Sequence, residues 1–437
     1  MKKGFVFNQS LCVNCKACSA ACSLENNFTV KVRNVLTYNR EAAASVPLSH
    51  LSIACNHCEI PVCMMGCPVS AYRYDSLSEA VIVDESKCFG CKYCVWNCPY
   101  DAPKYDPVKG VIGKCHFCYS RLGEGIEPAC SSGCPTGALS YADLSELNPM
   151  NTTEWFPENE LSPSFRFKGI TKNIPLRIIP DSLFIKKINS VPEEKKIRRS
   201  DWSLILFSFF SMLSVSFIAS LLLKGELRDS LLLVILLFLP GVFSVFHLSK
   251  WYRAWRAVFN FKSSPLSREI AAYLFYVIIS ITSVFSHAPW LLVVAVVSGL
   301  LLLLAIDGVY IYSQKDPVVY LHSGQTFITA LLLISFLSGS VWPFIFIACI
   351  KILISIYLYK PSGRNIDILR HIRNALLLVA GASIISGISY PQLSVIIIFL
   401  TGEFLDRILF YFDFEPTNIN NLIYKHIAEG KYETERD

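Results

Sequence analysis

The sequence has 437 residues, a net charge of +6, 53% hydrophobic residues and 17% charged residues. The length predicts two or more domains, and so small a charge gives no indication of nucleic-acid binding. The composition divides the chain in two, because sixteen of its seventeen cysteines lie between Cys12 and Cys134, whereas nearly all long apolar runs follow Trp202. The remaining cysteine, Cys349, lies in an apolar stretch, where we expect a small buried hydrophobic side chain.

The cysteines of the first half form four groups of four. The groups are Cys12, Cys15, Cys18 and Cys22; Cys55, Cys58, Cys63 and Cys67; Cys88, Cys91, Cys94 and Cys98; and Cys115, Cys118, Cys130 and Cys134. The first and third groups have the Cys-x2-Cys-x2-Cys-x3-Cys spacing of bacterial ferredoxins. Three thiolates on one tight loop hold three irons of a cubane, and the fourth cysteine serves the other cluster of a pair. Four groups therefore predict four [4Fe–4S] clusters.

Two structural alternatives compete with clusters. Zinc also binds Cys-x2-Cys pairs, but a zinc site needs only two pairs and has no use for a third cysteine and a trailing Cys-Pro. Disulfides are disfavoured because the triplets are crowded, and because the N-terminus has neither the apolar core of a signal peptide nor a twin-arginine pair. The spacing favours iron–sulfur ligation.

Three stretches carry a family resemblance. They read Phe-Asn-Gln-Ser-Leu-Cys-Val-Asn-Cys-Lys-Ala-Cys at 7–18, Cys-Asn-His-Cys-Glu-Ile-Pro-Val-Cys at 55–63 and Lys-Cys-His-Phe-Cys at 114–118. The sequence here resembles the iron–sulfur subunit of dimethyl sulfoxide reductase-type molybdoenzymes over about residues 1–145. The resemblance implies an α+β ferredoxin-like domain, which we place at 1–147.

The resemblance also implies which cysteines share a cluster, since the first group pairs with the fourth and the second with the third. The implied sets are Cys12, Cys15, Cys18 and Cys134; Cys22, Cys115, Cys118 and Cys130; Cys55, Cys58, Cys63 and Cys98; and Cys67, Cys88, Cys91 and Cys94. Some relatives lack a cysteine at the position of Cys94 and hold a three-iron cluster there. Because this chain keeps Cys94, we expect four cubanes.

The segment 148–200 is rich in proline and polar residues, and we expect an extended linker. An all-α membrane anchor is predicted at 201–412, followed by a polar C-terminal tail at 413–437. About eight apolar stretches of a length suited to membrane spans occur, at 202–223, 229–248, 270–287, 290–312, 321–339, 341–359, 373–391 and 392–411. The last two are separated only around Pro391, so seven spans is the alternative.

With eight spans, basic residues gather on the side of the cysteine domain. They are Lys195, Lys196, Arg198, Arg199, Lys250, Arg253, Arg256, Lys262, Arg268, Lys315, Lys360, Arg364, Arg370 and Arg373, against Lys224 and Arg228 on the other side. The positive-inside rule then predicts a multi-pass protein of the cytoplasmic (inner) membrane with its cluster domain in the cytoplasm. The alternative is that these cations dock the cluster domain, and some relatives face outward.

Ionisable residues at the edge of the membrane are the candidates for a substrate site. His247 ends the second apolar stretch, Arg253 and Arg256 follow it, and Glu269 opens the third. Histidine titrates near neutrality and a carboxylate relays protons, which suits quinol oxidation. Snorkelling or helix capping is the plainer interpretation, and Arg253 and Arg256 are also suited to anchoring at the membrane interface.

The region 200–412 resembles the membrane anchor subunit of the same reductases, so the chain looks like a fusion of two subunits. That resemblance implies menaquinol binding near His247 and Glu269, and no haem. Three further ionisable residues, Asp307, Lys351 and Glu403, are expected to pair inside the bundle.

Together these features predict an electron-transfer and membrane-anchor subunit. It would oxidise menaquinol and pass electrons through four clusters to a separate molybdopterin-containing catalytic subunit, which no motif of this chain replaces. The expected partners are therefore that subunit, membrane lipid and the quinone pool. The alternatives are the same conduit run in reverse to quinone, a redox-coupled ion pump, and an inert structural anchor.

Overall fold

A computed structural model of the chain describes residues 3–38, 48–145, 156, 160–168, 199–225, 231–286, 288–313, 325–358, 364–386, 393–414, 418–420 and 422–423. The chain divides into two compact units. The first comprises Met1–Lys186 and Pro416–Asp437, and the second comprises Lys187–Glu415. Each unit is described by itself.

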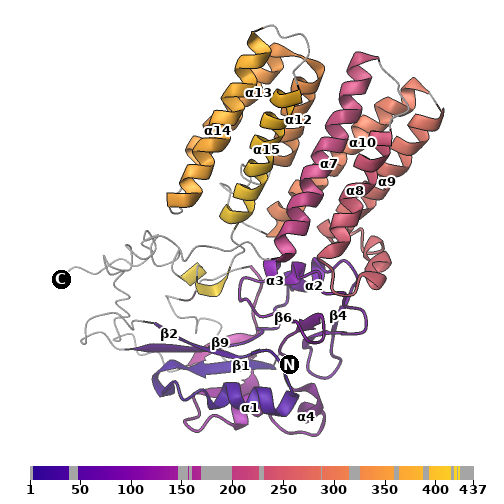
Figure 1. The fold of residues 1–437 in the computed structure, drawn as a ribbon. Coiled ribbons are helices and arrows are strands. Elements are labelled where there is room, and N and C mark those ends of the chain that lie inside the picture. Colours follow the sequence, from indigo (N-terminus) through magenta and orange to yellow (C-terminus); the bar gives the residue numbers. More distant parts are fainter. Residues whose placement is uncertain are drawn as a thin grey trace. The chain divides into compact units, whose positions relative to one another are not determined.

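The first unit is built on one three-stranded sheet and three hairpins (Figure 1). In the sheet, β1 (Lys3–Asn8) pairs antiparallel with β8 (Leu139–Asp143) and parallel with β9 (Phe165–Lys168). The hairpins are β2 (Asn34–Tyr38) with β3 (Ser49–Ile53), β4 (Tyr72–Tyr74) with β5 (Val81–Val83), and β6 (Lys104–Asp106) with β7 (Val111–Gly113). Apolar residues of several strands, among them Phe5, Phe7 and Leu51, form the core.

Short helices lie next to the cysteine loops. They are the 3₁₀ turn η1 (Gln9–Leu11), α1 (Ala17–Asn26), α2 (Val62–Met65), α3 (Tyr93–Asn97), α4 (Tyr119–Gly123) and α5 (Ala129–Ser132). Only α1 exceeds five residues, because the ligand spacing leaves little chain between the cysteines. The α+β ferredoxin-like fold expected for this half is confirmed.

The ordered part of the first unit extends beyond residue 147, where the sequence placed its end. Strand β9 lies inside the segment 148–200 that we expected to be an extended linker, and it completes the sheet beside β1. Phe156 and Leu161 are buried in the same core. The sequence did not predict this strand because the surrounding segment is rich in proline. Its alternating residues Phe165 and Phe167 pack against Phe7, with ring centres 6.4 and 6.3 Å apart.

The C-terminal tail also joins the first unit. Ile419 and Ile423 are buried in its core, and the hydroxyl of Tyr38 donates a hydrogen bond of 3.3 Å to the side-chain oxygen of Asn420. A polar tail was expected at 413–437. Two isoleucines four residues apart lie on one face of a helical turn, and this spacing provides the apolar contact.

Replacing Ile423 with alanine is expected to destabilise the first unit by about 2–5 kcal/mol, because a fully buried side chain leaves a cavity. Thermal loss of the visible absorbance of the clusters measures the effect as a lower midpoint temperature. The exposed Leu24→Ala is the matched control and should leave the midpoint unchanged. Equal midpoints for the two variants would contradict the docking of the tail.

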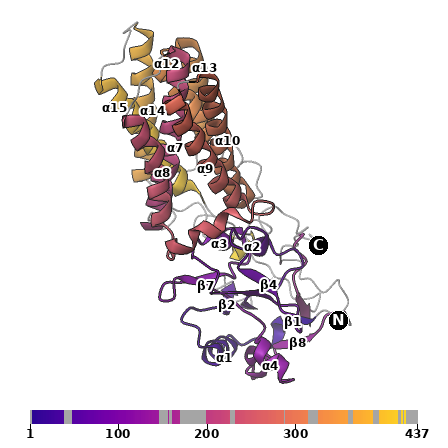
Figure 2. The same ribbon diagram turned by 90° about the vertical axis from the view of Figure 1, so that its right-hand side faces the viewer.

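The second unit is helical (Figure 2). Its described helices are α7 (Arg199–Lys224), α8 (Leu231–Phe246), α9 (Pro265–Ser286), α10 (Pro289–Ser313), α12 (Gln325–Ser338), α13 (Val341–Tyr357), α14 (Arg364–Ile385) and α15 (Leu393–Asp413). Consecutive helices run in opposite directions (Figure 1). Helix α7 packs against α8, α10 and α12, and the hydroxyl of its Ser216 donates a 3.1 Å hydrogen bond to the carbonyl of Ala330 in α12. Such small polar residues allow close helix packing in membranes.

Several helices are apolar enough to cross a membrane, but eight spans are not confirmed. Four described helices pass by length and composition, at Asp201–Lys224, Pro265–Ser286, Pro289–Ser313 and Ile366–Ile385. Helix α8 makes a fifth if it is taken together with the bent segment that follows it. Helices α12 and α13 have 14 and 17 residues, short of the roughly 20 that a span needs, and α15 carries buried charges.

Cys349 was expected to be buried, and this expectation is wrong. It lies on α13 with its side chain exposed at the surface of the unit. On an apolar helix an outward position suits a small side chain as well as an inward one, so the sequence alone does not decide between the two.

Candidate functional site

All seventeen cysteines lie in the described part of the chain and are free thiols. The sixteen of the first unit gather into four sets of neighbours. Cys12 lies close enough to interact electrostatically with Cys15, Cys18 and Cys134. Electrostatic proximity also groups Cys22, Cys115, Cys118 and Cys130; Cys55, Cys58, Cys63 and Cys98; and Cys67, Cys88, Cys91 and Cys94. These groupings are consistent with the four ligand sets that the resemblance implies, and the ligand sets stay a prediction.

The four sets form a series. Cys18 of the first set neighbours Cys22 of the second, and Cys115 of the second neighbours Cys55 of the third. The third and fourth sets meet at the buried hydroxyl of Tyr72, which interacts with both Cys63 and Cys67. Groups bound by these sets would therefore follow one another in this order.

The same backbone conformation occurs in each cysteine loop. The residue before the second cysteine has a positive φ in all four groups: 56° at Asn14, 42° at His57, 75° at Gly90 and 58° at Phe117. Only one of the four is glycine, and a bulky residue such as Phe117 in this region is strained. The left-handed residue turns the chain so that thiols three residues apart face the same point, and strain of this kind is typical of functional sites.

Backbone N–H groups point at the sulfurs. The amides of His57 and Ala71 donate to the thiols of Cys55 and Cys67, each at 3.4 Å. In the three groups that end in Cys-Pro, the last cysteine accepts several such bonds, because the chain after the proline folds back over it. Hydrogen bonds to sulfur stabilise negative charge there and raise cluster potentials.

Burial raises the pKa of the Cys22 thiol to about 12 and that of Cys67 to about 11. At neutral pH these thiols keep their protons until iron displaces them, as metal ligands generally do. Among the described residues, no three histidine, cysteine or acidic side chains converge closely enough to hold one metal ion. A four-iron cluster is wider than a single ion, so its thiols lie farther apart, and four such thiols per set suit it.

Arg33 is a buried cation among the thiols. It is 1% exposed, its Nη1 donates to the hydroxyl of Ser52 at 3.2 Å, and its Cζ lies 4.3 Å from the ring centre of Phe5. Burial lowers the pKa of Arg33, but the thiols of Cys130 and its neighbours outweigh burial and raise the pKa overall. The guanidinium therefore offsets the negative charge of the first two sets.

Lys114 has the same role between the second and third sets. It is 3% exposed and donates to the carbonyl of Cys115 at 3.1 Å. Burial lowers its pKa, and interactions with Cys55, Cys63 and Cys115 raise it by more. His57 nearby stays neutral because burial, followed by Lys114, holds its pKa well below the usual range.

Sequence reasoning missed both cations. Arg33 lies in no motif, so no local signal indicates it. Lys114 directly precedes Cys115, and this adjacency was the only available indication.

Replacing Arg33 with methionine is expected to lower the midpoint potential of the nearest cluster. A unit charge about 10 Å away contributes roughly 1.7 kcal/mol at an effective dielectric constant near 20, or roughly 70 mV for a one-electron couple. An EPR-monitored redox titration measures the shift. Arg33→Lys should keep the potential, as should Arg73→Met on the exposed face of β4. An unchanged potential in Arg33→Met would contradict the role of the cation.

In the second unit three of the predicted substrate residues, His247, Arg253 and Arg256, lie between α8 and α9. His247 directly follows α8 and is half-buried. Arg253 and Arg256 lie in the 3₁₀ helix η2 (Trp251–Val258), which bends by 112° from α8. Their guanidinium carbons lie 5.4 and 5.3 Å from the rings of Tyr252 and Trp255. Exposed aromatic residues next to half-buried arginines on a bent segment are typical of a membrane interface.

Glu269 lies within the bundle, in the second turn of α9, and is 8% exposed. Its electrostatic neighbours are Arg407 on α15 and Asp307 on α10. The structure therefore brings Glu269 near two charged residues from other helices, neither of which the sequence assigned to the substrate site.

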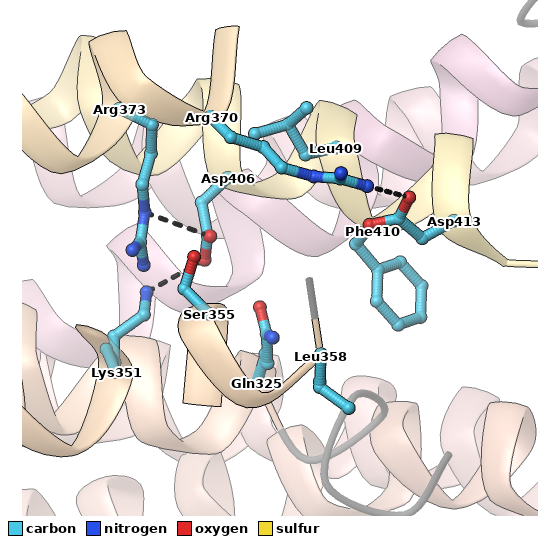
Figure 3. A pocket seen from close by; sticks show the side chains of 10 residues that line it. All are labelled: Gln325, Lys351, Ser355, Leu358, Arg370, Arg373, Asp406, Leu409, Phe410 and Asp413. Carbon is cyan, nitrogen blue, oxygen red and sulfur yellow. Dashed lines mark hydrogen bonds and ion pairs between the residues drawn. The ribbon is translucent and has the colours of Figure 1, made fainter. Parts of the chain in front are cut away.

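Asp307, Lys351 and Glu403 do make contacts inside the bundle. Lys351 forms ion pairs with Glu403 and with Asp406, the latter at 2.9 Å, and Asp307 accepts a hydrogen bond from the amide of Phe327 at 3.1 Å. A cavity of about 40 Å³ adjoins Lys351 and Asp406 (Figure 3).

The comparisons with known proteins define the class. Residues 46–144 match the family model of the 4Fe-4S dicluster domain. Together with the cysteine sets, this match makes the first unit a [4Fe–4S] electron-transfer domain.

The relatives define the family. The chain is 38% identical over 162 residues to the B subunit of the anaerobic dimethyl sulfoxide reductase of Haemophilus influenzae, covering 35% of this chain and 78% of the relative. Its identity to the corresponding subunit of Escherichia coli is 40% over 156 residues, covering 33% and 75%. Its identity to the B subunit of the polysulfide reductase of Wolinella succinogenes is 36% over 151 residues, covering 33% and 78%. The chain belongs to the family of these iron–sulfur subunits, with an additional apolar helical region.

Proposed function

We propose that this protein is the electron-transfer and membrane-anchor subunit of a quinol-dependent reductase. It would oxidise menaquinol at its helical unit and deliver electrons through four [4Fe–4S] clusters to a molybdopterin-containing catalytic subunit. The observation that carries the proposal is the unbroken series of four cysteine sets in a chain that continues into apolar helices.

The cluster domain supports this role with a full set of ligands for four cubanes. Each cluster, when bound, supplies a one-electron carrier. The chain's own residues hold those carriers in sequence, bury them, and offset their charge with Arg33 and Lys114. The relatives are named as B subunits of reductases, which supports a separate catalytic partner.

The helical unit supports a membrane anchor. Ile419 and Ile423 pack in the core of the first unit, so the chain returns to the side of the membrane on which it began. That return favours an even number of crossings, in keeping with eight and against seven. We retain the expectation of a cytoplasmic cluster domain in the inner membrane, based on the distribution of basic residues.

The quinol site is proposed between α8, η2 and α9, with His247 and Glu269 accepting protons and Arg253 and Arg256 on the interfacial segment. Quinol oxidation releases two electrons and two protons, so bases near the electron acceptor are required. Residues at the membrane interface are accessible to a lipid-soluble substrate, which favours this location.

The test is quinol-driven cluster reduction in membranes that contain the complete complex. A menaquinol analogue is added to wild type, His247→Ala and His371→Ala, and EPR follows the reduction. His371 is an exposed histidine on α14 and serves as the control. We expect the rate to fall at least about 100-fold in His247→Ala alone, with dithionite still reducing every cluster. Equal rates in all three proteins would contradict the proposed site.

A further inference from the structure

Buried polar side chains of the helical unit form a connected series that begins at Glu269. Arg407 is an electrostatic neighbour of both acids, Glu269 and Asp307. Its Nε donates to the hydroxyl of Ser208 at 2.7 Å, and it is 3% exposed. No described group accepts a hydrogen bond from its two Nη atoms. The Nη groups of Arg407 can therefore still donate hydrogen bonds. The guanidinium stabilises either acid when that acid loses its proton.

The second step leads from α10 to α12. Asp307 and the hydroxyl of Thr326 form a short hydrogen bond. Thr329 lies one turn further along α12, on the same face, and its hydroxyl accepts a 2.7 Å hydrogen bond from Lys351. Both threonines are buried, at 0% and 2% exposure. The turn between them spans about 5–6 Å, a gap that one water molecule closes.

The third step leads into the cavity of about 40 Å³ (Figure 3). Lys351 pairs with Glu403 and Asp406, and Nε of Arg373 lies 3.0 Å from the other oxygen of Asp406. On the other side of the cavity, Arg370 and Asp413 form an ion pair of 2.5 Å. The volume holds about two or three water molecules, and its polar lining suits them.

The series contains both acidic and basic side chains. Its acidic members among the described residues are Glu269, Asp307, Asp367, Glu403, Asp406 and Asp413, and its basic members are Arg370, Arg373, Arg407 and Lys351. Lys351 is shared by the carboxylates of Glu403 and Asp406, so a proton can pass from its ammonium group to either of them.

The series begins and ends at the same end of the bundle. Asp307 lies in the last two turns of α10, Thr326 begins α12, and Asp413 ends α15. Because consecutive helices alternate in direction, these positions belong to one end of the bundle, the end at which α15 leads back to the first unit. Between them, Lys351 and Glu403 lie near the middle of α13 and α15. A path that enters and leaves at the same end of the bundle separates no charge across the membrane.

We propose that this series conducts the protons released from quinol at Glu269 to the cavity beside Arg370 and Asp413, and so to the aqueous side on which the cluster domain lies. The inference rests on the proposed quinol oxidation. In that reaction the quinol loses two electrons to the clusters and two protons to the chain. Each proton passes from the Glu269 carboxylate to Asp307, through the threonine hydroxyls and Lys351 to Asp406, and on to water in the cavity.

The test uses changes that leave every charge in place. Thr326→Val and Thr329→Val remove one hydroxyl each and keep the side-chain shape. In membranes with the complete complex, we expect quinol-driven cluster reduction to slow about tenfold in each variant, whereas dithionite reduction and binding of a fluorescent quinol analogue stay unchanged. Thr326→Ser restores the hydroxyl and should restore the rate. Tyr276→Phe, which removes a buried hydroxyl of α9 bonded to Ser214 at 2.8 Å, is the control off the series.

A second readout needs no variant. In sealed vesicles of known orientation, quinol oxidation by wild type should acidify the side that carries the cluster domain. Acidification of the opposite side would overturn the inference, as would wild-type rates in both threonine variants. If wild type oxidises no quinol at all, the proposed function itself falls, and this outcome differs from one in which only the variants behave unexpectedly.

Discussion

Replacing Glu269 with glutamine should slow menaquinol-dependent electron delivery by about 10²–10⁴-fold, the usual contribution of a positioned general base. Glutamine keeps the size of the side chain and its place beside Arg407 but takes no proton. Steady-state quinol oxidation by the complete complex in membranes measures the effect.

The conservative variant distinguishes chemistry from packing. Glu269→Asp keeps a carboxylate, and we expect it to recover most of the rate that glutamine loses. Wild-type turnover in Glu269→Gln would show that this carboxylate takes no part in quinol oxidation. Equal losses in both variants would point to packing of the buried side chain as the cause.

Replacing Cys130 with serine is expected to stop electron delivery from quinol to the catalytic subunit, reducing it to background. Cys130 belongs to the second cysteine set, which stands between the first and third, and the described thiols offer no route around it. Low-temperature EPR should register the loss or conversion of one four-iron signal while the others remain.

Cys349→Ser is the matched control, because this exposed cysteine of α13 belongs to none of the four sets. It should leave both the spectra and the turnover unchanged. Normal electron delivery in Cys130→Ser would contradict a serial arrangement of the clusters.

The sequence predicted those parts of the molecule that depend on local spacing. The gaps between cysteines predict tight loops. The structure shows how each loop turns, through one residue with left-handed backbone conformation at Asn14, His57, Gly90 or Phe117. The α+β character of the first unit and the apolar helices of the second also follow from local patterns.

Features that depend on distant contacts could not be read from the sequence. Strand β9 pairs with β1 across more than 150 residues, and Ile423 reaches a core formed by the first 170. Arg33 acquires its role only because folding buries it among thiols from two cysteine groups. Likewise, Thr326 can be assigned to the proposed proton path only because α10 places Asp307 within hydrogen-bond distance of it.

Fewer helices are recognised as spans by length and hydropathy than the eight that the sequence predicts, and the reason is physical. Charged residues such as Lys351 and Arg407 interrupt the apolar pattern that identifies a span, and their partners lie on other helices. A search by hydropathy therefore tends to miss, as membrane spans, the helices that carry the proposed proton path.

The conduit is tested most directly by adding a menaquinol analogue to membranes that contain the wild-type complex and counting reduced clusters by low-temperature EPR. Quinol should reduce the clusters, and full reduction should give spins equivalent to four [4Fe–4S] centres per chain. A protein whose clusters dithionite reduces but quinol never does would contradict the conduit, because its electrons would then come from another source.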